Sequence, residues 1–391
     1  MKKLQKVAVL FNANKGYDRK IIKGIARYSR EVANWHICVE EDLVTRLDNL
    51  ANWQGDGIIA DFDDPKIAEF VCAKNIPCVA VGSSYREASL YPKNVHYVAT
   101  NNDEIARLGS EHLARLGLKN LGFYTGFVDK NSRWALEREI AFIEHATAAG
   151  YNNTNLHVLR PQNVSLDRVE NINQLADWIA SLPKPIGIMA PTDMRAWQVF
   201  EACQQIDVSI PEDVAVLGVD GDDLILDLTG NQLSTVTQGT EHMGYLASSI
   251  LNQVMAQVPP NQTIHLVDPI GLQICHSTDV EVIADEFVRK ALAYIKGHAD
   301  KGIKVVHVLN HLGISRANLD KRFKVALNAT VHEVIFDEQL NLVSDYLLNS
   351  KMTLQQIAEA VGYKSPQYMM MVFKGRYGVT PSEFRKNHGA I

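Results

Sequence analysis

The chain has 391 residues, of which 46% are hydrophobic, and its formal net charge is −6. This composition is typical of globular proteins and excludes a disordered, collagen-like or coiled-coil chain, while the length predicts two or three domains. The sequence contains no run of about 18 apolar residues, so we expect no membrane span. The N-terminal segment lacks the apolar stretch of a signal peptide, and the five cysteines show no CxxC spacing, so we expect a cytoplasmic protein with reduced thiols.

The net charge hides a division between two parts of the chain. Residues 281–391 carry 15 basic and 11 acidic side chains, whereas residues 1–280 carry 24 basic and 34 acidic ones. All five cysteines also precede residue 281. We therefore predict two domains with different roles, an acidic one at 1–280 and a basic one at 281–391.

Short apolar segments alternate with amphipathic segments in the first 280 residues. The predicted strands are Lys6–Phe11, His36–Val39, Gly57–Ala60, Pro77–Val81, Asn120–Tyr124, His157–Leu159, Ile186–Ala190 and Val214–Val219. Helical patterns lie between them, for example over Asp103–Leu116, Ser132–Ala149 and Leu166–Leu182. The alternation predicts an α/β fold with parallel sheets and right-handed crossovers.

Parallel sheets bind ligands at the carboxyl ends of their strands, so the residues that follow the predicted strands are candidates for a site. These positions are rich in carboxylates, amides and arginines, which bind hydroxyl groups, and in aromatic rings, which cover the apolar face of a sugar. The candidate sugar-binding residues are Lys15, Tyr17, Asp18, Ser83, Arg133, Trp134, Arg138, Asp193, Asp220 and Gln238. At any single position the alternative is that the Asp or Asn only caps the next helix.

The sequence offers no catalytic constellation. It contains no GxSxG, HExxH or GxxxxGK[ST] motif, and no GxGxxG follows a predicted strand. We therefore predict a binding protein with no catalytic residues, no cofactor and no metal. The alternative is an intracellular sugar-handling enzyme, which would require an acid–base pair that the sequence does not indicate.

Five segments resemble the two-lobed sensor domain of the LacI family and of periplasmic sugar-binding proteins. They are Asn101–Leu113, Arg138–Phe142, Pro191–Asp193, Gly218–Asp220 and Thr235–Gln238. The resemblance implies that Arg138, Asp220 and Gln238 hold sugar hydroxyls, and it aligns Asp193 with the second residue of an Asn-Asp pair.

The chain also departs from the LacI pattern in three places. Thr192 stands where the family has the first residue of its Asn-Asp pair, and Gly82-Ser83 replaces the usual hinge aspartate. LacI-type repressors begin with a DNA-binding headpiece, whereas this sequence begins with the first sensor strand. A DNA-binding module is therefore expected elsewhere in the chain.

Residues 281–391 contain an internal repeat with a spacing of 50 residues. Phe323, Lys324, Thr330 and Glu333 recur as Phe373, Lys374, Thr380 and Glu383. Each copy has an apolar helix, a glycine turn, a capping serine and a second helix, which predicts helix-turn-helix units at about 305–324 and 354–374. A linking helix over Val331–Asn349, about 28 Å long, would separate the two second helices by close to one DNA turn of about 34 Å.

The exposed positions of the two second helices are candidates for base or phosphate contacts. The predicted DNA-binding residues are Ser315, Arg316, Asn318, Lys321, Arg322, Ser365, Gln367, Tyr368 and Lys374. Over about residues 283–386 the pattern resembles the DNA-binding domain of the AraC family. Gln339 stands where that family usually has Arg, and Met369-Met370-Met371 replaces its Phe-x-Arg, so the second unit is expected to contribute less affinity.

A LacI-type sensor in front of an AraC-type reader is a rare order. Together with the opening Leu10–Arg19 and the segment Ile59–Asp64, this order resembles a family of bacterial sugar-operon regulators. The resemblance implies a transcriptional activator whose effector is D-xylose, with another pentose as the alternative. It also implies three partners, namely double-stranded operator DNA, RNA polymerase and a second copy of the chain in a homodimer, and no membrane.

Overall fold

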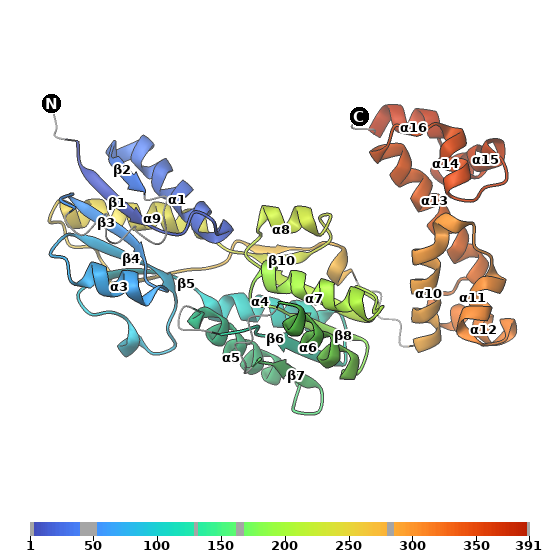
Figure 1. Cartoon of the computed structure of the whole chain (residues 1–391), viewed down its shortest axis with the longest axis horizontal. Helices are drawn as coiled ribbons and strands as arrows, with labels where there is room; N and C mark the ends of the chain where they lie inside the picture. The colour runs from blue at the N-terminus through green and yellow to red at the C-terminus, as the bar shows by residue number, and fades with distance from the viewer. Residues whose placement is uncertain (1–3, 40–52, 129–131, 162–167, 280–284, 389–391) are drawn as a thin grey trace. The chain divides into compact units, whose positions relative to one another are not determined.

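The computed structural model describes residues 4–39, 53–128, 132–161, 168–279 and 285–388. The chain divides into two compact units, Met1–Glu281 and Val282–Ile391 (Figure 1). We call them unit 1 and unit 2 and describe each by itself.

Unit 1 is built from alternating strands and helices. Its strands are β1 (Lys6–Leu10), β2 (His36–Val39), β3 (Gly57–Asp61), β4 (Cys78–Ser83), β5 (His96–Thr100), β6 (Asn120–Tyr124), β7 (Leu156–Leu159), β8 (Ile186–Met189), β9 (Val214–Val219), β10 (Ser234–Thr237), β11 (Ile264–Val267) and β12 (Gly271–Gln273). Its α-helices are α1 (Gly16–Tyr28), α3 (Pro65–Cys72), α4 (Asn102–Arg115), α5 (Arg133–Ala148), α6 (Arg168–Ser181), α7 (Asp193–Gln205), α8 (Asp223–Leu228) and α9 (Thr240–Met255). Short helical turns are η1 (Ser29–Ala33), η2 (Ala88–Leu90) and η3 (His276–Thr278).

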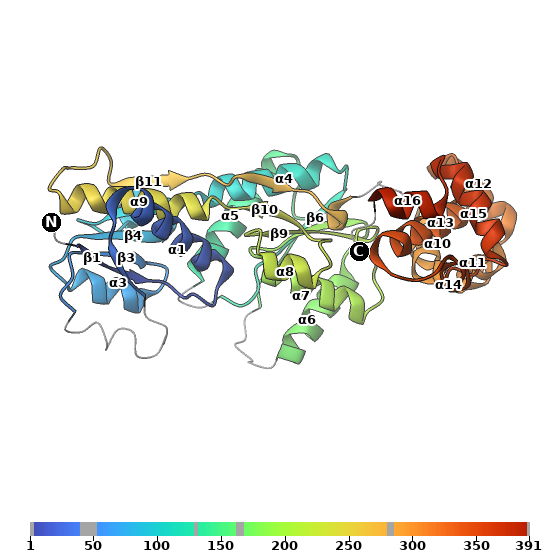
Figure 2. The ribbon, with the colours of Figure 1, turned by 90° about the horizontal axis from the view of Figure 1, so that it is seen from above.

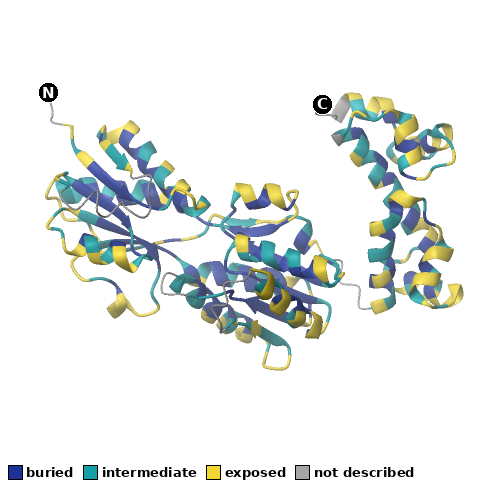
Figure 3. Ribbon diagram, in the orientation of Figure 1, coloured by how far each residue is buried: buried dark blue, intermediate teal, exposed yellow. Residues whose placement is uncertain are grey.

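The strands form two six-stranded sheets, each the centre of one lobe. The order is β11-β5-β4-β3-β1-β2 in lobe 1 and β12-β10-β9-β8-β6-β7 in lobe 2, and every pair is parallel except β10 with β12. Most residues of the central strands are buried because helices cover both faces of each sheet (Figure 3). β8 and β9 are buried along their whole length. The predicted two-lobed α/β fold with parallel sheets is confirmed.

Two strands of lobe 1 were not predicted, and both give weak sequence signals. β5 has only three apolar residues between His96 and Thr100. β11 is an edge strand in which Leu266 is exposed, so it lacks the pattern of a strand buried on both faces.

The chain crosses between the lobes after β5, after β10 and after β11, and hydrogen bonds tie these crossings together. Thr100 Oγ1 donates to Gln238 Oε1 (2.6 Å), and Asn101 Nδ2 donates to Asp268 Oδ1 (2.7 Å). The Ile270 amide donates to the Thr237 carbonyl (2.8 Å). Figure 2 shows the segment after β11 running from lobe 1 to lobe 2 beside β10. These crossings form the hinge.

Helices α1 and α9 pack on one face of lobe 1 at an unusually close crossing (Figure 2). A Cβ at Gly24 would lie 2.0 Å from the Glu241 carbonyl oxygen, and one at Gly244 would lie 2.0 Å from that of Ile21. Only glycine allows the two backbones to approach this far. The crossing matters for the site because Tyr17 lies in the first turn of α1.

Unit 2 is entirely helical in its described residues. Its elements are α10 (Glu286–His298), η4 (Ala299–Lys301), α11 (Val305–Leu312), α12 (Arg316–Leu327), α13 (Val331–Asn349), α14 (Leu354–Ala360), α15 (Pro366–Tyr377) and α16 (Pro381–His388). The two predicted helix-turn-helix pairs are α11–α12 and α14–α15. The recurring pairs Thr330/Glu333 and Thr380/Glu383 form capping boxes at the starts of α13 and α16.

Helix α13 belongs to both hydrophobic cores of unit 2. Val331 and Ile335 pack with Phe323 in the first core, whereas Val343 and Leu347 pack with Phe373 in the second. The linking helix is therefore fixed at both ends by buried side chains, which holds the two helix-turn-helix units in one spatial relation.

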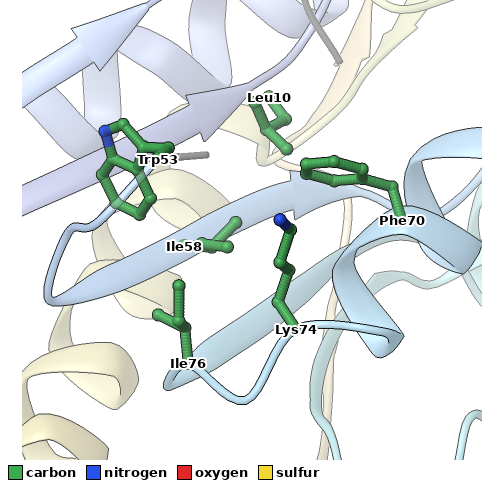
Figure 4. A pocket seen from close by; sticks show the side chains of 7 residues that line it. Leu10, Trp53, Ile58, Phe70, Lys74 and Ile76 are labelled. Atoms are coloured by element: carbon green, nitrogen blue, oxygen red, sulfur yellow. The ribbon is translucent and has the colours of Figure 1, made fainter. Parts of the chain in front are cut away.

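Four further features of the described residues concern helix length, metal ligands, cysteines and a small cavity. Within the described residues no helix is long and apolar enough to cross a membrane, and no cluster of His, Cys, Asp or Glu is arranged to hold a metal. All five cysteines are free thiols. A cavity of about 10 Å³ in lobe 1, lined by Trp53, Phe70 and Lys74 among others, has room for about one water and not for a sugar (Figure 4).

We expect Gly24→Ala to lower the free energy of unfolding of unit 1 by about 1–3 kcal/mol, because the added methyl group would collide with the backbone of α9. Urea unfolding followed by circular dichroism measures the change. Gly297→Ala in α10 of unit 2 is the control for a helical Gly→Ala change without a collision, since a Cβ there meets nothing within 4 Å and alanine favours the helix. A loss of stability of equal size in both variants would contradict the close-crossing interpretation.

Candidate functional site

Polar side chains from both lobes meet where the carboxyl ends of the two sheets face each other. The contributing residues of lobe 1 lie at or after the ends of β1, β3, β4 and β5, and those of lobe 2 lie in the first two turns of α5 and after β8, β9 and β10. We call the central group the interlobe cluster and define it as Tyr17, Asp61, Asp63, Asn102, Arg138, Asp220 and Gln238.

Arg138 is the buried centre of the cluster, with 3% of its surface exposed. Its Nε donates to Asn102 Oδ1 (2.9 Å), its Nη1 donates to the Pro191 carbonyl, and Nη1 lies 4.0 Å from Asp220 Oδ1. Its guanidinium lies 5.5 Å from the centroid of the Trp134 ring. Burial lowers the pKa of Arg138, and Asp220, Tyr17, Asp63 and Asp193 oppose this shift. Arg138 therefore stands among acidic groups from both lobes.

Asp220 has a strained backbone and a perturbed carboxylate. Its φ of 122° is rare for a residue with a side chain, and such strain is typical of functional positions. Gln238 Nε2 donates to its Oδ1 at 2.5 Å. Burial raises the pKa of Asp220 to about 6, although Arg138 and the Gln238 hydrogen bond favour the ionised form. The carboxylate is thus held in a place that disfavours its charge.

Asp193 is fully buried beneath this loop and uses both oxygens within the protein. Oδ1 accepts from Thr235 Oγ1 (2.6 Å) and Oδ2 accepts from the Asp222 amide (2.7 Å). A Cβ at Gly218 would lie 2.2 Å from Oδ1, so glycine is required there. Burial and the neighbouring Asp220 raise the pKa of Asp193. Its contacts fix the loop that carries Asp220.

Two aspartates that were absent from the predicted set lie in the cluster. Asp63 Oδ2 accepts from the Ser83 amide (2.9 Å), and Asp61 Oδ1 accepts from the Asp63 amide (2.9 Å). Burial raises the pKa of both, and the charges of Asp63 and Asp18 add to the shift at Asp61. Both residues come directly at the end of β3, so the rule that selected the other candidates could have found them.

Arg133 connects the lobes at the edge of the cluster. Its Nη2 lies 2.8 Å from Asp63 Oδ1, its Nη1 donates to the Ser84 carbonyl (2.6 Å), and its guanidinium lies 3.6 Å from the Tyr85 ring centroid. Two further interactions cross the interface between the lobes. Lys20 Nζ donates a hydrogen bond to the Gly221 carbonyl, and Arg86 forms a salt bridge with Glu144 (2.6 Å).

The remaining predicted residues of lobe 1 line or support the cluster. The Tyr17 hydroxyl lies 3.7 Å from Met243 Sδ, and burial followed by the charges of Asp63, Asp18 and Asp61 raises its pKa. Asp18 is buried and accepts from the Asn12 amide (2.7 Å), which fixes the loop after β1. Ser83 Oγ accepts from Asn102 Nδ2 (2.6 Å). Lys15 is exposed, and its charge lowers the pKa of Asp61 and Asp63.

In unit 2, the residues predicted on α12 divide into an exposed set and a supporting set. Arg316, Asn318 and Lys321 are exposed. Ser315 Oγ accepts from the Asn318 amide (3.4 Å) and caps the helix. Arg322 is paired with Asp285 at 2.6 Å and covers the Phe287 ring, so it ties α12 to α10.

Helix α15 presents its predicted residues in the same way. Ser365 Oγ accepts from the Tyr368 amide (3.2 Å) and caps the helix. Gln367, Tyr368 and Lys374 are exposed, whereas Met369 is buried in the second core.

Comparisons with known proteins agree with this architecture. Family models match residues 6–103 as an XylR N-terminal domain, residues 110–278 as a periplasmic binding protein-like domain, and residues 308–387 as a helix-turn-helix domain. The xylose operon regulatory protein of Escherichia coli strain K12 is 38% identical over 98% of this chain and 97% of its own length. That of Haemophilus influenzae is also 38% identical, over 98% of both chains.

The chain belongs to the xylose operon regulatory protein family. A solved structure of a xylose-binding transcription activator covers 99% of both chains with a TM-score of 0.82 and 36% identity. A periplasmic binding protein/LacI transcriptional regulator of Alkaliphilus metalliredigens, complexed with D-xylulofuranose, has a TM-score of 0.57 at 18% identity over 71% of this chain, which supports the fold alone. As a member of this family the chain is a transcriptional regulator, and we call unit 1 the sensor and unit 2 the reader.

We expect Asp220→Asn to stabilise the sensor at pH 7.5 in the absence of sugar. The pKa of Asp220 is about 6 in the folded protein and about 3.9 in an unfolded chain. Above pH 6 the folded state therefore holds a carboxylate whose charge it disfavours, and asparagine removes a penalty of about 1–3 kcal/mol.

The gain should disappear as the pH falls from 6 toward 4, because folded wild-type Asp220 then takes up its proton. Urea unfolding at pH 7.5 and pH 4.5 measures both values. Asp227→Asn, which removes an exposed carboxylate from α8, is the matched control. A gain from Asp220→Asn that is larger at pH 4.5 than at pH 7.5 would refute the assignment.

Proposed function

We propose that the sensor binds D-xylose in the interlobe cluster and that the bound sugar makes the chain activate transcription. The observation that carries this proposal is the convergence of a buried arginine, Arg138, with acidic groups from both lobes, among them Asp63 and Asp220. Sugar hydroxyls donate to carboxylates and accept from guanidinium groups, so a pentose can satisfy this set from one position. The similarity over the full chain to xylose operon regulatory proteins supports xylose as the pentose.

The residues divide into those that touch the sugar and those that hold them in place. Arg138, Asp220, Gln238 and Asp63 bind hydroxyl groups, with Asp61 and Lys15 beside them. Tyr17 and Trp134 cover the apolar face of the ring. The residues that hold the sugar contacts in place are Asp18, Ser83 and Asp193, whose contacts lie within the protein, together with Arg133 at the lobe interface.

A sugar that binds groups of both lobes favours the arrangement in which both lobes contact it at the same time. Such a ligand shifts a conformational equilibrium only by its difference in affinity between the two states. In a homodimer this shift reorients the two readers relative to double-stranded operator DNA, where the activator contacts RNA polymerase. The chain carries out this role in the cytoplasm, where its operator lies.

Within the reader, α12 and α15 contact DNA. Arg316, Asn318 and Lys321 of α12 and Gln367, Tyr368 and Lys374 of α15 are the exposed residues that reach bases or phosphates. Ser315, Ser365 and Arg322 hold these helices in position.

We expect D-xylose to raise the melting temperature of the full chain more than any other pentose or hexose in a thermal-shift panel. A sugar at 100 times its dissociation constant adds about 2.7 kcal/mol of stability. Asp220→Asn should abolish the response because it replaces an acceptor of two hydroxyls, and Asp227→Asn should retain it. Another sugar with the largest shift would replace xylose as the effector, and no shift with any sugar would remove the sensor proposal.

We expect Arg316→Ala to weaken binding to operator DNA by about tenfold or more, since a base or phosphate contact of an arginine is worth about 1–3 kcal/mol. The operator is obtained by selection from random duplexes with the full chain in the presence of D-xylose. Fluorescence anisotropy then gives the affinity, and Arg115→Ala, which removes an exposed arginine from α4 of the sensor, is the control. Equal affinities of Arg316→Ala and wild type would assign DNA reading to another surface.

A further inference from the structure

The two helix-turn-helix units can be compared position by position because their helices are built in the same register. Ser315 and Ser365 cap the second helices, and each helix ends at a residue with positive φ, Asn328 (52°) and Gly378 (75°). Leu319 and Phe323 are buried on α12, as are Met369 and Phe373 on α15. Residues 50 apart therefore occupy equivalent places on the two helices.

The exposed faces of the two helices differ in chemistry although they occupy the same places. The exposed residues are Arg316, Ala317, Asn318, Lys321, Lys324, Val325 and Ala326 on α12, and Gln367, Tyr368, Met371, Lys374, Gly375 and Arg376 on α15. Lys321 thus has Met371 as its equivalent, and Arg316 has Pro366. At equivalent positions α15 lacks the exposed cations Arg316 and Lys321 and gains Arg376 in place of Ala326. It also carries two large, partly apolar side chains, Tyr368 and Met371, in place of Asn318 and Lys321.

Met371 is 63% exposed and Tyr368 is 49% exposed. These side chains are three residues apart and therefore lie on one face of the helix. Met371 packs into neither core of the reader, so its exposure has no structural reason within the described residues.

We propose that α15 reads thymine, with Met371 and Tyr368 packing on the 5-methyl groups that thymine presents in the major groove. The methyl group is the apolar feature by which thymine differs there from the other bases. Gln367 lies on the same face and can accept from and donate to adenine, so the face as a whole fits A·T pairs. Lys374 supplies a phosphate contact one turn further on. This inference rests on the proposed DNA-binding role of α15.

The test replaces each thymine of the selected operator, one at a time, by uracil, which removes only the 5-methyl group. Binding of the full-length wild type should weaken about fourfold at each thymine that α15 contacts, as expected for one buried methyl group. Met371→Ala should bind the thymine operator more weakly and should no longer distinguish thymine from uracil at one or more of these positions. Met194→Ala, which removes a methionine of similar exposure (52%) from α7, should retain the wild-type ratio at every position.

Three results would overturn the proposal. The first is equal affinity of the wild type for the operator and for all its uracil variants. If Arg316→Ala still weakens binding in that case, unit 2 remains the DNA-binding unit and only the thymine proposal fails. The second is a thymine-to-uracil ratio in Met371→Ala that equals the wild-type ratio at every position. The third is a loss of activated transcription in Met371→Ala without any change in operator affinity. That result would make the exposed pair Tyr368 and Met371 a docking site for RNA polymerase. If the chain selects no DNA at all, the proposed function fails and this inference fails with it.

Discussion

The sensor depends on one buried charge, the guanidinium of Arg138. A charge that is 3% exposed is stable only when hydrogen bonds and opposite charges surround it. Its hydrogen bonds go to Asn102 and to the Pro191 carbonyl, while its nearest carboxylate, Asp220, remains 4.0 Å away. Burial raises the pKa values of Asp61, Asp63, Asp193 and Asp220, and the nearby cations and hydrogen bonds compensate for it only in part. The proposed pentose would supply hydroxyl donors to the carboxylates of this set that line the site.

The strand β10 connects this cluster to the last described segment of the sensor, which contains Ser277 and Thr278. At one end, Gln238 holds Asp220 and accepts from Thr100 of lobe 1. At the other end, the Ser234 amide donates to Ser277 Oγ (2.8 Å), and Thr278 Oγ1 donates to Ser234 Oγ (2.7 Å).

The segment that follows β12 is therefore anchored in the core of lobe 2. Ser277 Oγ donates to the Val216 carbonyl (2.6 Å), and His112 Nε2 lies 2.9 Å from Thr278 Oγ1. Burial lowers the pKa of His112, which keeps the ring neutral and able to take part in this hydroxyl network. Four residues of one strand thus separate the proposed sugar contacts from the point where the chain leaves the sensor.

Local patterns predicted most of the fold because they reflect local physics. Buried parallel strands give short apolar runs, and capping serines, turn glycines and capping boxes mark the helices of the reader. β5 was missed because its apolar run is short, and β11 was missed because it is a partly exposed edge strand that pairs with β5 and lacks the pattern of a buried strand. Asp61 and Asp63 could have been found from their place after β3.

Other features of the site could not be read from the sequence, since they depend on which side chains the fold brings together. The hydrogen bond from Arg138 to Asn102 joins residues 36 positions apart, and the pairing of Arg322 with Asp285 joins residues 37 positions apart. A pattern indicates that an arginine lies on a helix, but it does not say whether the side chain faces solvent or a carboxylate from a distant segment. Arg322 was predicted as a DNA contact, yet in the structure it ties two helices of the reader together.

The exposed faces of α12 and α15 differ in chemistry, and this difference can be explained because α13 is fixed in both cores of the reader. A weakly cationic unit such as α14–α15 would gain little from phosphate attraction by itself, since that attraction depends on the number of cations. In the proposed mode of DNA binding, α13 holds α15 at a high effective concentration over the neighbouring groove once α12 is bound, so affinity from the first unit positions the second. The second unit then has no need of further cations, and its exposed face is free to discriminate between base pairs. The net charge of −6 therefore says little about DNA binding, because the reader carries the basic excess while the sensor holds the acidic excess.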